Sequence, residues 1–433
     1  MSYRSRCAVA ALTVLGLVLA YAGQALAIPA FARQNKAECS TCHTIYPTLN
    51  EFGEAFMKNS YVWPGKPKAA AANSSPDARK EAMLLAGIPE MIPVSFRASL
   101  DAAYDPSQEN KFDLSTRALQ LQAGGAFRRL AGFFVTYNAY TEGPPKSSST
   151  GVTPSNNNPD LQELFVQWRH AFGTPINLKA GRFEPDLTLW KTSNRLTIAD
   201  LATQEYRVGD SPFAVGDPQD ALELNGTIGP RVFAAAGIVN RKEQNTKEGY
   251  GHLECRIGGT DYLGNEPEVD LDSDSIWDYL SLTVGGYGYF GRNADAELGP
   301  YNDDYYRAGI DADLLYKRFR LRFSGVKGRD NAPNYTARNV ANSLVMVGEA
   351  QYLFGSPVNL IGLFRYEYVD DASGISRNYI PSLVFAPIQN VKLTLEYQYK
   401  AESEHLGRTD SNDIALLPGT INRIGLIGAS FSF

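Results

Sequence analysis

The sequence predicts an all-β transmembrane barrel of about 16 antiparallel strands, preceded by a small α-helical module at the N-terminus. Three features predict this fold class. From residue 93 onward, hydrophobic residues recur at every second position in segments of roughly ten residues, the length that a tilted strand needs to cross a bilayer. The N-terminus has the pattern of an export signal. Between these two regions the chain has helical spacing and a compact cysteine motif.

The composition excludes several other classes of protein. The 433 residues include 38 glycines and 24 prolines without a repeat and only 4 cysteines, which excludes collagen, low-complexity disorder and a disulfide scaffold. The mean hydropathy is −0.26, and only one long apolar run exists, so a helical membrane bundle is excluded. With 41 basic and 47 acidic side chains the net charge is −6, and no nucleic-acid partner is expected.

Residues 1–27 have the pattern of a secretory signal peptide. Two arginines precede the apolar run Ala8–Ala20, and Ala25-Leu26-Ala27 is a small-x-small cleavage site. The alternative is an uncleaved anchor, although the run is short for crossing a bilayer. Cleavage would remove Cys7 and leave three cysteines in an exported protein.

The strongest chemical motif is Cys39-Ser40-Thr41-Cys42-His43. In a C-x-x-C-H sequence the two thiols can form thioethers to the haem vinyl groups while the adjacent imidazole ligates the iron. The alternatives are a redox-active dithiol or half of a zinc site. The sequence lacks both the surrounding βαβ pattern of the former and the second Cys/His pair of the latter. Residues 28–92 are therefore predicted to be a c-type cytochrome module with one haem c, attached at Cys39 and Cys42 and ligated by His43.

Two methionines are candidates for the sixth iron ligand. Met57 lies beside the apolar face of a helix predicted over Pro47–Asn59. Met83 lies in a second predicted helix, which opens at Ser75-Pro76 and closes at Gly87. Either methionine could equally be an ordinary core residue. A methionine ligand would raise the haem potential relative to a second histidine.

The module is small for the task of covering a haem. It has about 65 residues, some of them in a linker, and a segment of this size buries little surface by itself. We therefore expect another surface of the protein to shield the cofactor.

Residues 93–433 are predicted to form the barrel. Near the C-terminus, apolar residues at odd positions from Val391 to Tyr399 alternate with Lys392, Thr394, Glu396, Gln398 and Lys400. Likewise Phe319, Leu321 and Phe323 alternate with Arg318, Arg320 and Arg322. Charged side chains inside a small packed sandwich would be unfavourable, but they suit a barrel with a wet lumen and a lipid-facing outside. A soluble all-β fold is the alternative. The chain ends on Phe433, an aromatic terminus that resembles the insertion signal of outer-membrane barrels.

Fifteen strands can be placed from the alternation, near residues 94–104, 114–126, 131–141, 160–171, 176–184, 220–229, 231–240, 275–290, 304–315, 318–328, 342–353, 358–369, 377–386, 390–401 and 421–433. Bacterial barrels have an even number of strands, with short turns at the periplasmic end. Short turns can be assigned to the periplasmic end by counting strands from the N-terminus or from the C-terminus. The two assignments clash between residues 185 and 274. One strand is therefore missing there. We place it near Gly249–Gly258, with Thr203–Val208 as the alternative.

Two long segments interrupt the strand pattern. Residues 185–218 could fold inward and narrow the lumen, or form a plain surface loop. Residues 240–274 include Asp270, Asp272 and Asp274, whose alternating carboxylates could bind a hard cation such as calcium or ferrous iron. A solvated acidic stretch is the alternative for them. Cys255 is left over after haem attachment and is expected to be a buried thiol.

The N-terminal motifs resemble a known family. Residues 28–34 (IPAFARQ), Cys39-Ser40-Thr41-Cys42-His43, Pro47-x-Leu49-x-x-Phe52-Gly53-x-x-Phe56 and Tyr61 are similar to the fused monohaem cytochrome-porins of the outer membrane, whose best-known members are ferrous iron oxidases. The match is specific over about 35 residues and architectural over the barrel.

The resemblance implies a bacterial outer-membrane protein whose module lies in the periplasm or in the barrel lumen. It implies oxidation of extracellular Fe(II), an activity like that of an Fe(II):cytochrome c oxidoreductase, with electrons passing to a periplasmic c-type cytochrome or another soluble carrier. Two other functions remain open. One is a diffusion porin in which the haem module is a plug or redox sensor, and the other is a conduit that delivers electrons outward to an external acceptor.

Overall fold

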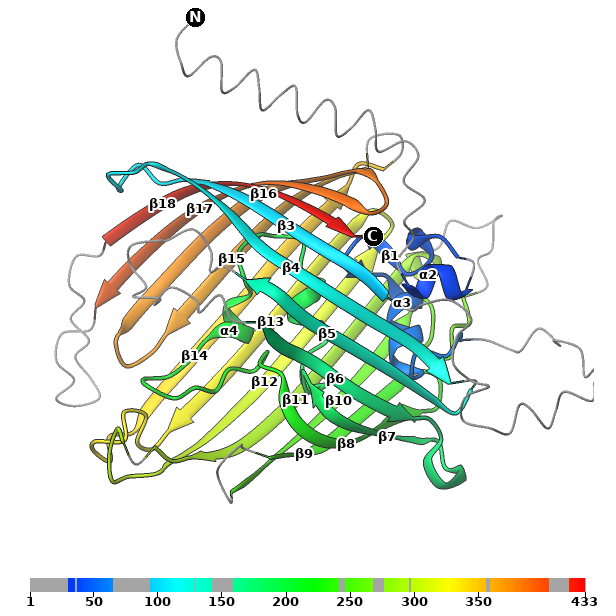
Figure 1. Cartoon of the computed structure of the whole chain (residues 1–433), viewed down its shortest axis with the longest axis horizontal. Coiled ribbons are helices and arrows are strands. Elements are labelled where there is room, and N and C mark those ends of the chain that lie inside the picture. Colours follow the sequence, from blue (N-terminus) through cyan, green and yellow to red (C-terminus); the bar gives the residue numbers. More distant parts are fainter. Residues whose placement is uncertain are drawn as a thin grey trace, which may run out of the picture.

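The structure is a computed structural model that describes residues 30–35, 37–64, 94–127, 129–141, 159–240, 246–267, 276–295, 297–355, 359–404 and 420–432. Sixteen strands, β3 to β18, pair in sequence order, and β18 pairs with β3 to close an antiparallel barrel (Figure 1). The predicted fold class of the barrel is thus confirmed. Within the described ranges, no helix is long and apolar enough to cross a membrane.

The strands agree closely with the predicted segments. They are β3 (Val94–Tyr104), β4 (Phe112–Phe127), β5 (Ala131–Thr141), β6 (Asp160–Trp168), β7 (Ile176–Phe183), β8 (Gln219–Ile228), β9 (Val232–Asn240), β10 (Lys247–Gly258), β11 (Leu280–Asn293), β12 (Asp303–Tyr316), β13 (Phe319–Asp330), β14 (Ala341–Leu353), β15 (Leu360–Asp370), β16 (Gly374–Ile388), β17 (Val391–Glu404) and β18 (Thr420–Ser432). The missing strand is β10, as predicted for Gly249–Gly258. The alternative position was wrong, because Ala202–Glu205 forms the short helix α4.

The period-two pattern separates the two faces of the wall. On β13 the side chains of Arg320 and Arg322 are buried on the inside, whereas Leu321 and Phe323 are exposed on the outside. On β17, Glu396 is buried and Leu395 is 53% exposed. An outer face of this kind is stable only against lipid, because so continuous an apolar surface is not left in water.

The two ends of the barrel differ in their connections. Short turns join β4 to β5, β12 to β13 and β16 to β17, at the end where the C-terminal strand finishes and the N-terminal elements lie (Figure 1). The connections at the opposite end include the long segment between β7 and β8. In bacterial barrels the end with short turns faces the periplasm.

The described part of the N-terminal module is compact. It consists of α2 (Ala30–Asn35), a 3-10 turn at Cys39–Thr41, a two-stranded sheet of β1 (His43–Ile45) and β2 (Thr48–Leu49), and α3 (Glu51–Lys58). The helix predicted from Pro47 starts later, because Thr48 and Leu49 pair with β1 and Asn50 caps the helix by accepting a bond from the Gly53 amide, 2.9 Å away. The predicted helix that contains Met83 lies outside the described residues.

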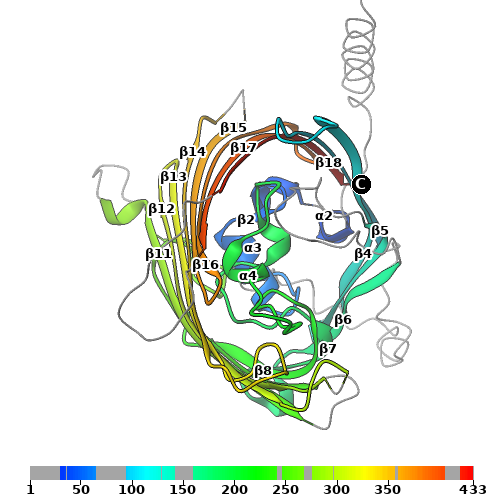
Figure 2. The same cartoon turned by 90° about the vertical axis from the view of Figure 1, so that its left-hand side faces the viewer.

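The segment between β7 and β8 folds into the lumen, where α4 lies within the ring of strands together with α2 and α3 (Figure 2). It also contains a 3-10 turn at Thr192–Asn194. The Ile198 amide donates to Glu396 at 2.7 Å, and Lys392 donates to the Leu196 carbonyl at 3.0 Å. The inward alternative for residues 185–218 is therefore confirmed, and inner-wall charges satisfy the backbone of the segment.

One prediction about the region before β11 is wrong, and another stays a prediction. Cys255 is partly exposed on the outer face of β10 rather than buried, because the alternation directs His252 and Glu254 inward. Asp270, Asp272 and Asp274 lie outside the described residues, in the connection from β10 to β11. Short 3-10 turns at Ala171–Gly173 and Ile276–Asp278 complete the described elements.

Replacing Leu395 with arginine should destabilise the barrel. Leu395 lies between Leu383 and Ile427 on neighbouring strands, and all three side chains are exposed on the outer face. A charge near the bilayer midplane costs about 2–4 kcal/mol. Urea unfolding of the barrel in vesicles measures the loss. The control is Gln398→Arg on the inner face of the same strand, where Glu396 lies within reach of position 398. Equal stability of the two variants would contradict a lipid-facing Leu395.

Candidate functional site

A cavity lies between the module and the barrel at the end with the short turns. Its volume is about 1460 Å³, including the part open to solvent. Its lining includes Cys39, Cys42, His43 and Met57 from the module. The remaining lining comes from the barrel wall and from the lumen segment.

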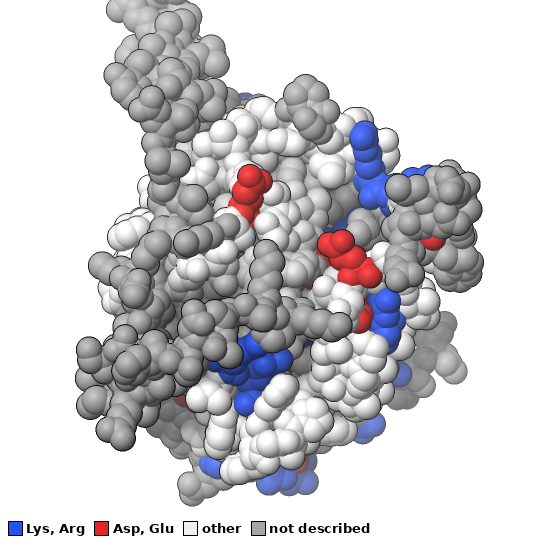
Figure 3. Space-filling model, turned by 90° about the vertical axis from the view of Figure 1, so that its right-hand side faces the viewer, with Lys and Arg blue, Asp and Glu red and all other residues white. Residues whose placement is uncertain are grey.

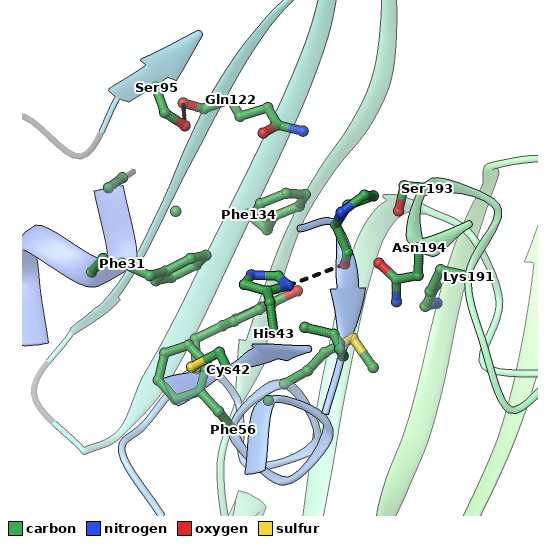
Figure 4. Close-up of a pocket in the computed structure, with 18 of the residues that line it drawn as sticks. Phe31, Cys42, His43, Phe56, Ser95, Gln122, Phe134, Lys191, Ser193 and Asn194 are labelled. Atoms are coloured by element: carbon green, nitrogen blue, oxygen red, sulfur yellow. Dashed lines mark hydrogen bonds between the residues drawn. The ribbon is translucent and has the colours of Figure 1, made fainter. Parts of the chain in front are cut away.

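A backbone hydrogen bond orients the imidazole of His43. Its Nδ1 lies 3.1 Å from the carbonyl oxygen of Pro47, so Nδ1 carries the proton and donates it to this hydrogen bond (Figure 4). Nε2 is left as the atom with a free lone pair. Burial lowers the pKa of His43 to about 4, although hydrogen bonding to the Pro47 carbonyl opposes this shift. The imidazole is therefore neutral at physiological pH, and its tautomer is fixed by the backbone, as in metal-ligating histidines.

The two cysteines of the motif lie beside His43 and do not resemble reactive thiols. Burial raises the pKa of Cys42 to about 11, and the neighbouring Cys39 adds to the shift. Burial also raises the pKa of Cys39. Redox-active dithiols and zinc ligands need a lowered thiol pKa, because the thiolate is the reacting species. In addition, no three His, Cys, Asp or Glu side chains gather as a metal site in the described part of the chain.

Helix α3 packs directly on the motif through Gly53. A Cβ atom at this position would lie 2.1 Å from the carbonyl oxygen of Cys42, so only glycine permits the contact. Met57 lies one turn further along the same helix and also lines the cavity. The structure thus brings Met57 to the cavity of His43, whereas Met83 lies outside the described residues.

Aromatic rings from both parts of the chain enclose the cavity. Phe31 stacks on Tyr61 with ring centroids 5.0 Å apart, and it meets Phe56 edge-on at 5.3 Å. Phe134 on β5 continues the stack at 6.2 Å from Phe31, and Phe165 on β6 lies 6.1 Å from Phe134. The barrel therefore covers the side of the cavity that the small module leaves open.

Ion pairs fix the first half of α3 to the inner wall. Glu54 pairs with Arg256 on β10 and lies 3.7 Å from the Arg320 guanidinium on β13. The Arg320 side chain also donates to the Leu49 carbonyl at 3.2 Å, and Glu51 accepts a bond from the Thr260 amide at 3.1 Å. Because Glu54 and both arginines are shielded from solvent, these contacts depend on exact placement of the helix.

Lys58 anchors the other end of α3. Its ammonium pairs with Glu254 and lies over the rings of Phe233 and Tyr262, at 4.6 and 4.5 Å from their centroids. Burial lowers the pKa of Lys58 to about 7. Asn59 then donates to the Tyr262 carbonyl at 2.6 Å.

The lumen segment forms the third wall of the cavity. Lys191, Ser193 and Asn194 lie on the side of His43 away from Cys42 (Figure 4). Thr48 of the module donates to the Asn194 carbonyl at 2.7 Å. Lys191 pairs with Asp186 at 2.7 Å. Burial opposes ionisation of Asp186, but Lys179 and Lys191 lower its pKa well below the usual range, so the charge of Lys191 is neutralised.

These residues fit a haem c. Two thiols of suitable spacing, a neutral imidazole whose Nδ1 proton is committed to a backbone carbonyl and an aromatic cavity are the features that the cofactor requires. Cys39, Cys42 and His43 were singled out from the motif. The barrel and lumen-segment residues were not, since they lie far away in sequence and carry no local signal.

Comparisons with known structures identify the fold of the barrel. Similar structures include an anion-selective porin from Comamonas acidovorans, with 13% identity, a TM-score of 0.54 and coverage of 79% of this chain and 99% of the porin. The outer-membrane channel DcaP of Acinetobacter baumannii has 10% identity and a TM-score of 0.50, covering 79% of this chain and 97% of the channel. Salmonella typhi OmpF, in complex with daunomycin, has 10% identity and a TM-score of 0.50, covering 78% of this chain and 97% of OmpF. The fold is therefore that of a porin-like outer-membrane barrel. No protein-family model matches the chain, and no curated protein does.

Replacing Gly53 with alanine should disturb the cysteine motif. The added methyl group cannot fit against the Cys42 carbonyl, so α3 must move away from the motif. We expect at least a several-fold loss of covalently bound haem per protein, measured by haem staining and absorbance after export. The control is Gly348→Ala on β14, where nothing lies within 4 Å of the new methyl group. Normal haem content in Gly53→Ala would contradict the packing.

Proposed function

We propose that this protein transfers electrons at the bacterial outer membrane through one haem c, covalently held at Cys39 and Cys42 in the periplasmic mouth of a 16-strand barrel. Extracellular Fe(II) is the proposed electron donor, and a periplasmic c-type cytochrome or another soluble carrier is the proposed acceptor. Residues 28–92 are the proposed cytochrome module.

The observation that carries the proposal is the geometry of His43. Its Nδ1 is committed to the Pro47 carbonyl, its burial keeps the ring neutral, and both cysteines of the motif line the same cavity. A haem c bound here would supply a one-electron Fe(III)/Fe(II) couple. Met57 is the proposed sixth ligand among the described methionines, because it lines this cavity.

The barrel residues exclude water and hold the module in place. Phe134 and Phe165 close the apolar side of the cavity, and the ion pairs of Glu54 and Lys58 fix α3 against the wall. An iron centre in the periplasmic mouth of the barrel lies closer to the outer surface than one in a free periplasmic domain would. This position supports electron transfer from an extracellular donor on one side to a periplasmic carrier on the other.

Fe(II) as the donor rests on the resemblance of the N-terminal motifs to the fused cytochrome-porins, and the net charge of −6 would help to attract cations. At the module end of the molecule, acidic and basic side chains lie in separate small groups (Figure 3). A surface of mixed charge favours transient binding of a partner through several weak ion pairs rather than through one strong electrostatic field.

The protein should be reduced by Fe(II) through His43. Purified protein in detergent, mixed with anaerobic Fe(II), should show the absorbance bands of ferrous haem within the dead time of manual mixing. His43→Ala should lose at least a hundredfold in reduction rate, because the iron loses its axial nitrogen. His170→Ala, at the turn after β6, is the control for loss of a histidine. Haem that stays oxidised under Fe(II) in the unmodified protein would refute Fe(II) as donor.

A second candidate is a diffusion porin in which the module is a plug or redox sensor. The comparisons favour it, because the similar structures are porins and channels. The inner wall argues for a restricted lumen, since Arg365 and Glu223 are 0% exposed beneath the inserted segment. Side chains that line an open aqueous channel would be hydrated.

Conductance separates the two candidates. In planar bilayers the intact protein should conduct several-fold less than a variant in which a short Gly-Ser linker replaces residues 187–216, because that segment fills the lumen. Replacing residues 106–110, most of which are exposed, in the connection between β3 and β4 is the control and should leave conductance unchanged. Large conductance of the intact protein, equal to that of the 187–216 variant, would support the diffusion porin instead.

A further inference from the structure

The haem cavity has one wall where polar groups lack partners. This wall is the seam at which the barrel closes, between the first strand, β3, and the last, β18. Arg97 on β3 and Ser432 on β18 are directly paired in register and both line the cavity. The Nε of Arg97 and the hydroxyl of Ser432 are buried, and neither has a hydrogen-bond partner among the described residues.

Such an arrangement is costly without a ligand. A buried polar group without a hydrogen bond destabilises the protein, and a charged group does so more strongly. Ser432 is only 1% exposed, so water cannot easily satisfy its hydroxyl. The guanidinium of Arg97 lies 5.9 Å from the ring centroid of Tyr46, a residue of the module between β1 and β2. Arg97 therefore sits where the module meets the seam.

The carboxylate nearest to Arg97 along its strand is already engaged. Asp101, on the same inner face of β3, is 3.2 Å from Arg117. Lys392 on β17, which pairs in register with Ser430, donates to the Leu196 carbonyl of the lumen segment. Asp101 is committed to Arg117 and therefore does not balance the positive charge of Arg97.

On the opposite side of the cavity, acidic side chains balance the charges of the lysines. Lys191 is neutralised by Asp186, and Lys179 lies 3.3 Å from the same carboxylate. Glu163 also lines the cavity there. An anionic group would be poorly accommodated on that side but well accommodated at the seam.

We propose that Arg97 and Ser432 bind a carboxylate of the haem, one of its two propionates, so that the closing seam of the barrel holds the cofactor. The inference rests on the proposed function, since it requires haem at Cys39 and Cys42. Arginine suits this role because its planar fork matches a carboxylate with two hydrogen bonds. Arg97 and Ser432 are positioning residues, because they touch the edge of the haem rather than its iron.

The test compares haem potentials and resonance Raman spectra of the intact, haem-loaded barrel and its variants. Arg97→Gln removes a positive charge near the iron, which favours the ferric state. The ferric form should become at least tenfold more favoured, a downward shift of 59 mV or more for a one-electron couple. Arg97→Lys should lower the potential less than Arg97→Gln does, since the positive charge remains although the planar guanidinium that can donate two parallel hydrogen bonds is lost.

The Raman spectrum separates direct contact from distant electrostatics. The propionate bending band should shift in Arg97→Gln and also in Ser432→Ala, which removes a single hydrogen-bond donor without changing charge. Arg423→Gln is the matched control. Arg423 is an arginine on the same closing strand at its other end, near Tyr399. It should leave both the potential and the band unchanged.

Inorganic phosphate is the probe that tests whether the group at Arg97 and Ser432 is a haem propionate or a free anion. If a propionate occupies the seam, phosphate leaves the potential of the unmodified protein unchanged. A potential that follows phosphate concentration, and does so only while Arg97 is present, would mean that a free anion occupies the site and would overturn the proposal. An unchanged propionate band in both Arg97→Gln and Ser432→Ala would also overturn it. Absence of haem from the unmodified protein would instead refute the proposed function.

Discussion

The contact between helix α3 and the inner wall of the barrel is the interaction on which the site depends. Glu54 and Lys58 lie on the same short helix and pair with Arg256 and Glu254, which alternate on the inner face of β10. The helix in turn holds the cysteine motif through the Gly53 contact. If the helix were displaced, each of these buried charges would lose its partner, at a cost of several kcal/mol.

This constraint explains why a small module is joined to a large barrel. The described module has too few residues to enclose the cavity by itself. Phe134 and Phe165 from the wall and Asn194 from the lumen segment complete it. The same side chains of the wall thus serve both the barrel and the module. A barrel with a purely polar inner face could not offer an apolar surface to a cofactor.

Much of the fold can be predicted from the sequence because alternation is a local signal. Leu321 and Arg322 are neighbours in the chain, and their opposite environments are visible in any window of a few residues. The alternation of turns between the two ends of the barrel even locates β10, although glycines weaken the hydrophobic pattern of this strand. The mean hydropathy of −0.26 conceals the membrane, since it averages the two faces. The position of Cys255 could also have been derived from the phase of β10.

The site is less predictable, because its parts come from distant regions of the chain. The C-x-x-C-H motif is contiguous and therefore recognisable. Nothing in the sequence around Arg97 or Asn194 shows that these residues line the same cavity as His43, since barrel closure and the inward fold of residues 185–218 bring them there. The proposed cation ligands Asp270, Asp272 and Asp274 lie outside the described residues, so their role stays a prediction.

The central claim is that a single iron lies inside the barrel at His43. Anomalous X-ray diffraction at the iron absorption edge, from crystals of the intact exported protein, tests it most directly. We predict one iron peak per chain, next to His43 Nε2 and enclosed by Phe134 on the wall and Asn194 on the lumen segment. A barrel with no iron peak, or with a peak outside the ring of strands, would contradict the account.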